Sequence, residues 1–294
     1  MEHPIVVGVG DLDRDRGALH WAADEAAHRG AGLRLIHVWG QAPHSGWAAQ
    51  ALVSYRVGAL PARDVIRRAV CEVRERVPDL EVTGTCVLGS GRPAGVLLRT
   101  AHDAQLLVIG GHAHRRADLA LLPSTAHALA ARTVCPLIVA GPDPGVERVE
   151  PAGLVVVGID EHATEAAITF AFDYASRHGA AVRAVHAFSF QDAVGEVDRD
   201  TGSAETSYEA HSRLLAEALA GWGEKYPDVA ISYGPYHGGA PETLAVLSSG
   251  ADLLVLGARR GSRRQPVLGP VTRTMLAGAH CPVAVVPQTG VGDR

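Results

Sequence analysis

Lysine is almost missing from this chain. Lys225 is the only lysine among 27 basic residues, and the other basic residues are arginines scattered along a chain with a formal net charge of −5. Proteins that bind nucleic acids usually concentrate positive charge on one face, so the charge balance argues against a nucleic-acid partner. The chain also has no P-loop lysine and no G-x-S-x-G nucleophile motif, and we find no convincing pair of nucleophile and base.

Long hydrophobic runs are missing as well. The apolar stretches are short, as in Leu253–Gly257, whereas a helix that spans a bilayer needs about 20 apolar residues. The first predicted strand begins at Ile5, and no basic and apolar leader precedes it. We therefore expect no membrane association and a cytoplasmic location.

Cysteine pairs and metal-ligand clusters do not occur. The four cysteines are Cys71, Cys86, Cys135 and Cys281, and no two of them form a C-x-x-C motif. This spacing favours four free, mostly buried thiols over a disulfide framework or a zinc site. His112 and His114 stand close together, but Asp118 is the one acidic residue near them in sequence and no thiol is near, so we interpret them as loop histidines rather than metal ligands.

An internal repeat organises what is present. Five segments recur in the same order in the two halves, at offsets that drift only from 150 to 146 residues. The pairs are Ile5–Gly10 with Val155–Asp160, Leu35–Trp39 with Ala184–Phe188, Pro78–Val82 with Pro227–Ile231, Leu106–Gly110 with Leu253–Gly257, and Cys135–Pro136 with Cys281–Pro282. The repeat predicts two domains, 1–142 and 153–294, joined by a linker over 143–152 that is rich in proline, glycine and charge.

Each copy alternates two hydrophobic patterns. Continuous runs of Val, Ile and Leu are typical of strands buried on both faces of a parallel sheet. Between them lie helical stripes, such as Leu19, Ala22, Ala23 and Ala26. The order predicts an α/β fold: two tandem, doubly wound, Rossmann-like domains, each a five-stranded parallel sheet with helices on both faces. A ligand crevice is expected at the carboxyl ends of the strands, where the strand order reverses.

These motifs resemble the universal stress proteins, a family of adenine-nucleotide-binding regulators. The resemblance covers nearly all of both halves. It rests on the V-G-[VI]-[DG] end of the first strand, the His-[VA]-aromatic second strand, the glycine loop after the fourth strand, and the Cys-Pro-apolar last strand. It implies an aspartate that meets the nucleoside after the first strand and a backbone contact to adenine after the second. It also implies a phosphate loop of the form G-x2-G-x9-G-[ST] that ends on a helix N-terminus.

The second copy keeps more of this pattern than the first. The resemblance implies that its binding residues are Ile159, Asp160, Ala187, Gly257, Arg259, Gly269, Val271 and Thr272. Its loop is one residue shorter than the family form, with Arg260 at the second glycine position and Pro270 in place of the serine. Four arginines crowd the loop, at 259, 260, 263 and 264. They could hold phosphates by side chain, or form a solvated face or a partner patch.

The first copy has lost more. It offers Val38, Gly110 and Ser124, but the strand-end aspartate is replaced by Gly10, and Ala113 and Pro123 stand at glycine positions. Alanine resists positive φ and proline removes an N–H donor. We therefore expect the first site to be degenerate, and any nucleotide to bind in the second copy.

The resemblance implies a regulator of stress or dormancy physiology that binds ATP, with Mg²⁺ as a candidate companion ion. It would act through a protein partner that the sequence does not identify, and a homodimer is left open. Two alternatives stay open: a degenerate scaffold that acts only through protein contacts, and a slow ATPase or nucleotidyl transferase. The acidic segment 191–207 is expected to be a mobile surface loop beside the second crevice.

Overall fold

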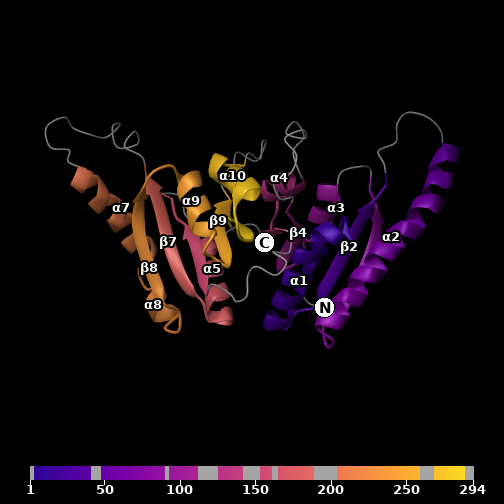
Figure 1. The fold of residues 1–294 in the computed structure, drawn as a ribbon, viewed down its shortest axis with the longest axis horizontal. Coiled ribbons are helices and arrows are strands. Elements are labelled where there is room, and N and C mark those ends of the chain that lie inside the picture. The colour runs from indigo at the N-terminus through magenta and orange to yellow at the C-terminus, as the bar shows by residue number, and fades with distance from the viewer. Residues whose placement is uncertain are drawn as a thin grey trace. The chain divides into compact units, whose positions relative to one another are not determined.

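The computed structural model describes residues 3–40, 48–89, 93–111, 125–141, 153–160, 165–188, 204–258 and 268–288. The chain divides into two compact units, unit 1 over 1–147 and unit 2 over 148–294. The predicted linker, 143–152, lies outside the described residues. Within the described residues each unit contains five parallel strands, and Figure 1 labels the helices and those strands for which there is room.

Unit 1 alternates strands and helices along its whole length. Its strands are β1 (Ile5–Gly8), β2 (Leu33–Trp39), β3 (Val82–Leu88), β4 (Leu106–Gly110) and β5 (Leu137–Ala140). Its helices are α1 (Leu12–Arg29), α2 (Ala48–Arg76), α3 (Pro93–Thr100) and α4 (Thr125–Ala130). The strand order is β3-β2-β1-β4-β5, so the order reverses between β1 and β4.

Unit 2 repeats this topology. Its strands are β6 (Leu154–Gly158), β7 (Ala181–Phe188), β8 (Ile231–His237), β9 (Leu253–Ala258) and β10 (Val283–Pro287). Its helices are α5 (Glu165–His178), α7 (Ala204–Ala218), α8 (Trp222–Lys225), α9 (Ala240–Ser248) and α10 (Pro270–Gly278). The order is β8-β7-β6-β9-β10, with the reversal between β6 and β9. The predicted fold class is confirmed.

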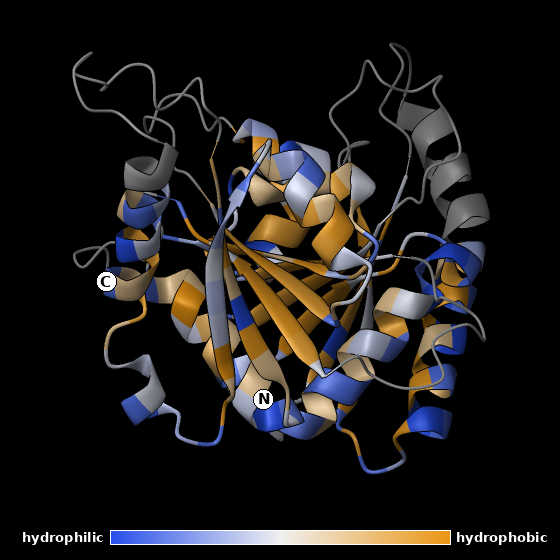
Figure 2. Ribbon diagram, turned by 60° about the vertical axis from the view of Figure 1, so that its left-hand side comes forward, coloured by the Kyte–Doolittle hydropathy of each residue, from blue (hydrophilic) through white to orange (hydrophobic). Residues whose placement is uncertain are grey.

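The strands are apolar because helices cover both of their faces. In unit 1, α1 and α2 pack against each other and against the sheet, and α3 and α4 also pack against each other. Right-handed crossovers place these two pairs on opposite faces. Figure 2 shows the consequence: the central strands are hydrophobic along most of their length, whereas the helices carry mixed faces. All four residues of β5 are buried.

Helix α1 has sequence signals at both ends. The Asp11 side chain accepts from the backbone N–H groups of Asp13 and Arg14, which is the geometry of an N-cap. Gly30 ends the helix at φ 60°, in the left-handed region that glycine enters without steric cost. Because Asp11 starts the helix so early, only a few residues separate the end of β1 at Gly8 from the start of α1 at Leu12.

The segment 191–207 is only partly described. Its last four residues, 204–207, belong to α7, so the prediction of a loop over the whole segment is wrong at that end. The physical reason is that Ala204 and Glu205 begin a helix whose face carries Leu215 into the core. Residues 189–203 lie outside the described part.

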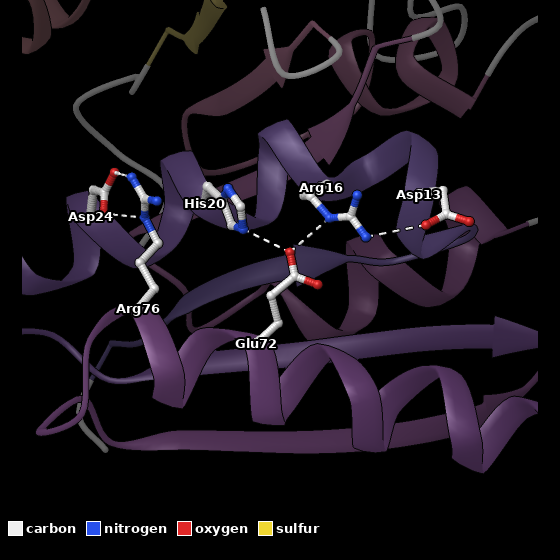
Figure 3. A network of polar contacts seen from close by, with 6 residues as sticks. All are labelled: Asp13, Arg16, His20, Asp24, Glu72 and Arg76. Carbon is white, nitrogen blue, oxygen red and sulfur yellow. Dashed lines mark hydrogen bonds and ion pairs between the residues drawn. The ribbon is translucent and has the colours of Figure 1, made fainter. Parts of the chain in front are cut away.

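A polar network joins α1 to α2 (Figure 3). The Oε1 atom of Glu72 accepts from Arg16 Nε at 2.9 Å and lies 2.7 Å from His20 Nε2. Farther along the same pair of helices, Arg76 makes a two-point contact with the Asp24 carboxylate, at 2.7 Å for both nitrogens. The Glu72 side chain is mostly covered, at 22% exposure, so its contacts are screened less than those of an exposed pair.

Glu72→Ala is expected to destabilise unit 1 by about 1.5–3 kcal/mol, because it removes the shared acceptor of two charged or chargeable donors. The matched control is Glu75→Ala, the same change on the same helix at an exposed position, with an expected effect within about 0.5 kcal/mol. Urea denaturation followed by circular dichroism measures both. Equal effects of the two substitutions would show that the network adds nothing to stability.

An aromatic cluster fills the corresponding corner of unit 2. Phe172 on α5 is fully buried, and its ring centroid lies 5.1 Å from that of Trp222 and 5.4 Å from that of Tyr226. The Tyr226 hydroxyl donates to Asp173 at 2.5 Å. Burial, and then the hydrogen bond to Asp173, raise the pKa of Tyr226 to about 12.

Tyr226 is expected to make unit 2 sensitive to alkaline pH. Its folded pKa of about 12 lies above the ordinary tyrosine value of about 10. The stabilisation is therefore complete below about pH 10 and is lost as the pH rises toward 12. Tyr226→Phe should reduce the loss of stability between about pH 10 and pH 12. The measurement is the change in the midpoint of urea unfolding between these two pH values. Tyr233→Phe, at an exposed tyrosine, should leave the decline as in the wild type.

Candidate functional site

A pocket opens at the carboxyl ends of the strands in unit 2. Its walls come from the ends of β6 and β9, from β7, from α9 and from the start of α10. A doubly wound sheet places its ligand crevice at this edge, where the strand order reverses. The lining residues are Gly158, Ile159, Asp160, Val185, His186, Ala187, Ala240, Leu244, Leu256, Gly257, Ala258, Gly269, Pro270, Val271, Thr272 and Gln288.

This lining contains seven of the eight residues predicted for the second copy. They are Ile159, Asp160, Ala187, Gly257, Gly269, Val271 and Thr272. The eighth, Arg259, lies outside the described residues together with the other loop arginines. Four separate segments of chain thus converge on one pocket. Their convergence is a structural fact, whereas their role in binding stays a prediction.

The N-terminus of α10 forms the polar end of the pocket. Gly269 is the N-cap residue and Pro270 is the first helical residue, which suits proline because that position needs no N–H donor. The first donor into the helix from this end is Arg273 N–H, which bonds the Gly269 carbonyl at 3.0 Å. The N–H groups of Val271 and Thr272 therefore have no acceptor within the helix. Together with the helix dipole they favour an anion here.

His186 sets the position of the strand end beside the pocket. Its Nδ1 atom lies 2.9 Å from the carbonyl oxygen of Ile159, and Ile159 N–H donates to Val185 at 2.8 Å. Because a carbonyl only accepts, Nδ1 of His186 carries the proton. The peptide groups on both sides of Ile159 are thereby held, and the half-buried Asp160 is the next residue. His186 is thus a histidine in the crevice wall whose hydrogen bonds are satisfied.

Behind His186 lies a second histidine that sequence reasoning missed. His211 on α7 has its Nδ1 atom 3.0 Å from His186 Nε2, and its ring stacks on Phe188 with centroids 4.3 Å apart. With both imidazoles neutral, His211 donates and His186 accepts. A signal was present: His211 stands four residues before the buried Leu215, which puts the two on one face of the helix.

Unit 1 has the same hydrogen bond from a histidine to the first strand end, but different residues around it. His37 Nδ1 lies 2.7 Å from the carbonyl oxygen of Val9, the counterpart of the bond to Ile159. Of the residues predicted for this copy, Val38 lies in β2, Gly110 ends β4, and Ser124 is outside the described residues. The strand-end position is Gly10, as the sequence indicates.

The Asp15 side chain, which sequence reasoning did not single out, occupies the space beside Gly10. Its Oδ2 atom accepts from the backbone N–H groups of Gly10 at 2.7 Å and Asp11 at 3.0 Å. Its Oδ1 atom lies so close to Gly110 that it would collide with a Cβ on that residue. A carboxylate therefore bridges the ends of β1 and β4, at the reversal of strand order in unit 1.

The other predicted features divide between described and masked parts of the chain. His112 and His114 lie outside the described residues, and the part that is described contains no cluster of three His, Cys, Asp or Glu side chains fit for a metal ion. None of the described helices combines the length and apolar character needed to cross a bilayer.

The four cysteines all lie in the described ranges, and none forms a disulfide. Two of them, Cys135 and Cys281, are buried, and burial raises the pKa of the Cys135 thiol. Cys71 is exposed because it points away from the core face of α2, so the prediction of mostly buried thiols is wrong there.

Both units share one doubly wound topology with a polar edge at the reversal of strand order, which defines a tandem α/β protein of one repeated domain type. The model of the universal stress protein family matches residues 1–141 and 153–287. The chain belongs to the universal stress protein family, with two of its domains in tandem. The resemblance stated from the motifs is confirmed.

Similar proteins share this tandem length. Universal stress protein Rv2005c of Mycobacterium tuberculosis is 31% identical over 300 residues, which cover 98% of each chain. Universal stress protein Rv2623 of the same species is 29% identical over 299 residues, 97% of this chain and 96% of that one. A universal stress protein structure from Archaeoglobus fulgidus superposes with a TM-score of 0.69 at 13% identity, covering 100% of this chain and 98% of that chain. This last likeness concerns the fold alone.

His186→Phe keeps a ring in the stack but removes the donor to the Ile159 carbonyl. We expect unit 2 to lose about 1–3 kcal/mol, because a buried acceptor is left without its partner. His37→Phe is the matched change in unit 1 and should destabilise that unit instead. Urea unfolding monitored by hydrogen exchange of each unit separates the two. If unit 2 keeps its full stability in His186→Phe, the bond to Ile159 does not hold the strand end.

Proposed function

We propose that this protein is an adenine-nucleotide-binding regulator and that unit 2 carries its binding site. One observation carries the proposal: the pocket gathers Asp160, the β7 backbone and the N-terminus of α10 around one space. The family resemblance implies these same three elements for the nucleoside, the adenine edge and the phosphates. The pocket also lies at the edge of the sheet where doubly wound folds bind nucleotides.

The polar end of the pocket suits the phosphates. The N–H groups of Val271 and Thr272 are not used by hydrogen bonds within the helix and are free to donate to a phosphate, and the dipole of α10 adds partial positive charge. Pro270 contributes no donor, so this contact set is smaller than in the family form. We assign to Arg259 the attraction for phosphate that the lost donors would have supplied. Arg259 directly follows the lining residue Ala258 in sequence.

The other end suits a nucleoside. Leu244, Leu256 and Ile159 supply apolar walls for a base, and the Ala187 backbone lies at the carboxyl half of β7 for contacts to the adenine edge. Among the lining residues that the structure describes, Asp160 is the one carboxylate. It can accept hydrogen bonds from ribose hydroxyls. An Mg²⁺ ion that accompanied ATP would be held by the phosphates and water together with this carboxylate.

The role we propose is binding rather than catalysis. The described part of the lining contains no nucleophile paired with a base, since His186 commits Nδ1 to the Ile159 carbonyl and Nε2 to His211. The protein would act in the cytoplasm, and the bound nucleotide would alter its contact with a protein partner.

Calorimetric titration with ATP, with and without Mg²⁺, tests the proposal. Asp160→Ala should weaken binding roughly tenfold or more, because a charge-assisted hydrogen bond is worth about 1.5–3 kcal/mol. The matched control is Asp228→Ala. Asp228 precedes β8 at the opposite end of the strands and accepts from Ser176, so its loss should leave the affinity for ATP unchanged.

Three results would contradict the proposal. An unchanged affinity in Asp160→Ala would move the site out of this pocket. No heat in the wild type, confirmed by equilibrium dialysis, would favour a scaffold that acts through protein contacts alone. Steady release of phosphate from ATP over hours would make the protein a slow ATPase, provided that the variant that no longer binds ATP also no longer releases phosphate.

A further inference from the structure

The crevice of unit 1 contains a carboxylate from the protein itself. Asp15 lies in the first turn of α1, yet its side chain turns back toward the sheet. There Oδ2 accepts from two successive backbone N–H groups, those of Gly10 and Asp11, at 2.7 and 3.0 Å. Successive N–H groups that converge on one point form an anion-binding nest. Asp15 fills this nest.

A second contact shows that the carboxylate reaches across the reversal of strand order. Oδ1 stands so close to Gly110 that a Cβ on that residue would collide with it, and the Asp15 Cγ atom would be 2.9 Å from that Cβ. Gly110 is the last residue of β4, where the phosphate loop begins in the family pattern. The Asp15 carboxylate therefore fills the space beside the Gly110 backbone that a glycine leaves open for a ligand.

Unit 2 lacks this arrangement in its described part. The residue 150 positions after Asp15 is Glu165, the first residue of α5, and its side chain is exposed. At the position of Gly10 stands Asp160, which lines the pocket from the strand itself. The two units thus place their carboxylates differently: one beside an open pocket, the other between the strand ends.

We propose that Asp15 is a built-in occupant that closes the crevice of unit 1 to anionic ligands, so that each chain binds one adenine nucleotide, in unit 2. The stoichiometry rests on the proposed function, whereas the closure of unit 1 does not. Closure has two causes. The nest is already filled, and a phosphate that entered would meet a fixed negative charge.

Backbone amide NMR of the full chain tests the closure, with inorganic pyrophosphate and ATP as probes. In the wild type, the amide signals of Gly10, Asp11, Gly110 and Gly111 should not respond to either probe. In Asp15→Ala the same four signals should shift with pyrophosphate in a saturable manner. The matched control is Asp13→Ala, which removes an equal charge from the same helical turn, where the side chain is 83% exposed. It should leave unit 1 closed.

A measurement without ligand guards against a variant that is only misfolded. Hydrogen exchange at Gly10 and Asp11 should be slow in the wild type and at least several-fold faster in Asp15→Ala, while the amides of β1 stay protected. If the wild-type amides of unit 1 respond to pyrophosphate, or if Asp15→Ala never responds although it is folded, the closure is wrong. Failure of ATP to shift the amides of Ile159 and Asp160 would refute the proposed function alone.

Discussion

The hydrogen bond from a histidine on the second strand to the carbonyl after the first strand determines where each crevice begins. His186 makes it to Ile159 and His37 makes it to Val9. In a doubly wound sheet the chain leaves the first strand at the point where neighbouring strands diverge, so the backbone there would otherwise lack partners. One imidazole fixes that carbonyl, and the next residue is presented to the crevice at a set place.

The residue after the histidine-bound carbonyl differs between the two units, and the side chains around it differ as well. In unit 2 this residue is Asp160, which lines an open pocket. In unit 1 it is Gly10, which supplies no carboxylate, and a Cβ there would make only an ordinary contact with Asp15 Oδ2, at 3.4 Å. Gly110 must remain a glycine, because any side chain there would collide with Asp15. The glycine at the end of β4 is thus the one that a crevice closed from within requires.

Much of this architecture could be predicted from the sequence because it depends on periodicity and repetition. The buried runs of Val, Ile and Leu mark the strands, and the repeat places the histidines and strand ends of both copies. The position of Asp15 could not be predicted in this way. Its place in the first turn of a helix suggests only a favourable contact with the helix dipole, and its rotamer depends on the missing side chain at Gly110, which lies on another strand far away in sequence. His211 was missed for a similar reason, because its partner on β7 is 25 residues away.

A crevice that has lost its ligand still needs its backbone donors satisfied. If the family aspartate and the loop glycines disappear, the N–H groups of Gly10 and Asp11, which lie at exposed positions, have only water as an alternative partner. An internal carboxylate satisfies both donors at once and cannot dissociate. Asp15 is half-buried, so its net contribution to stability is modest, but as part of the same chain it competes with a free anion at a high effective concentration. A duplicated domain can therefore lose a binding function without losing the order of its crevice edge, provided that one side chain takes over the contacts of the ligand.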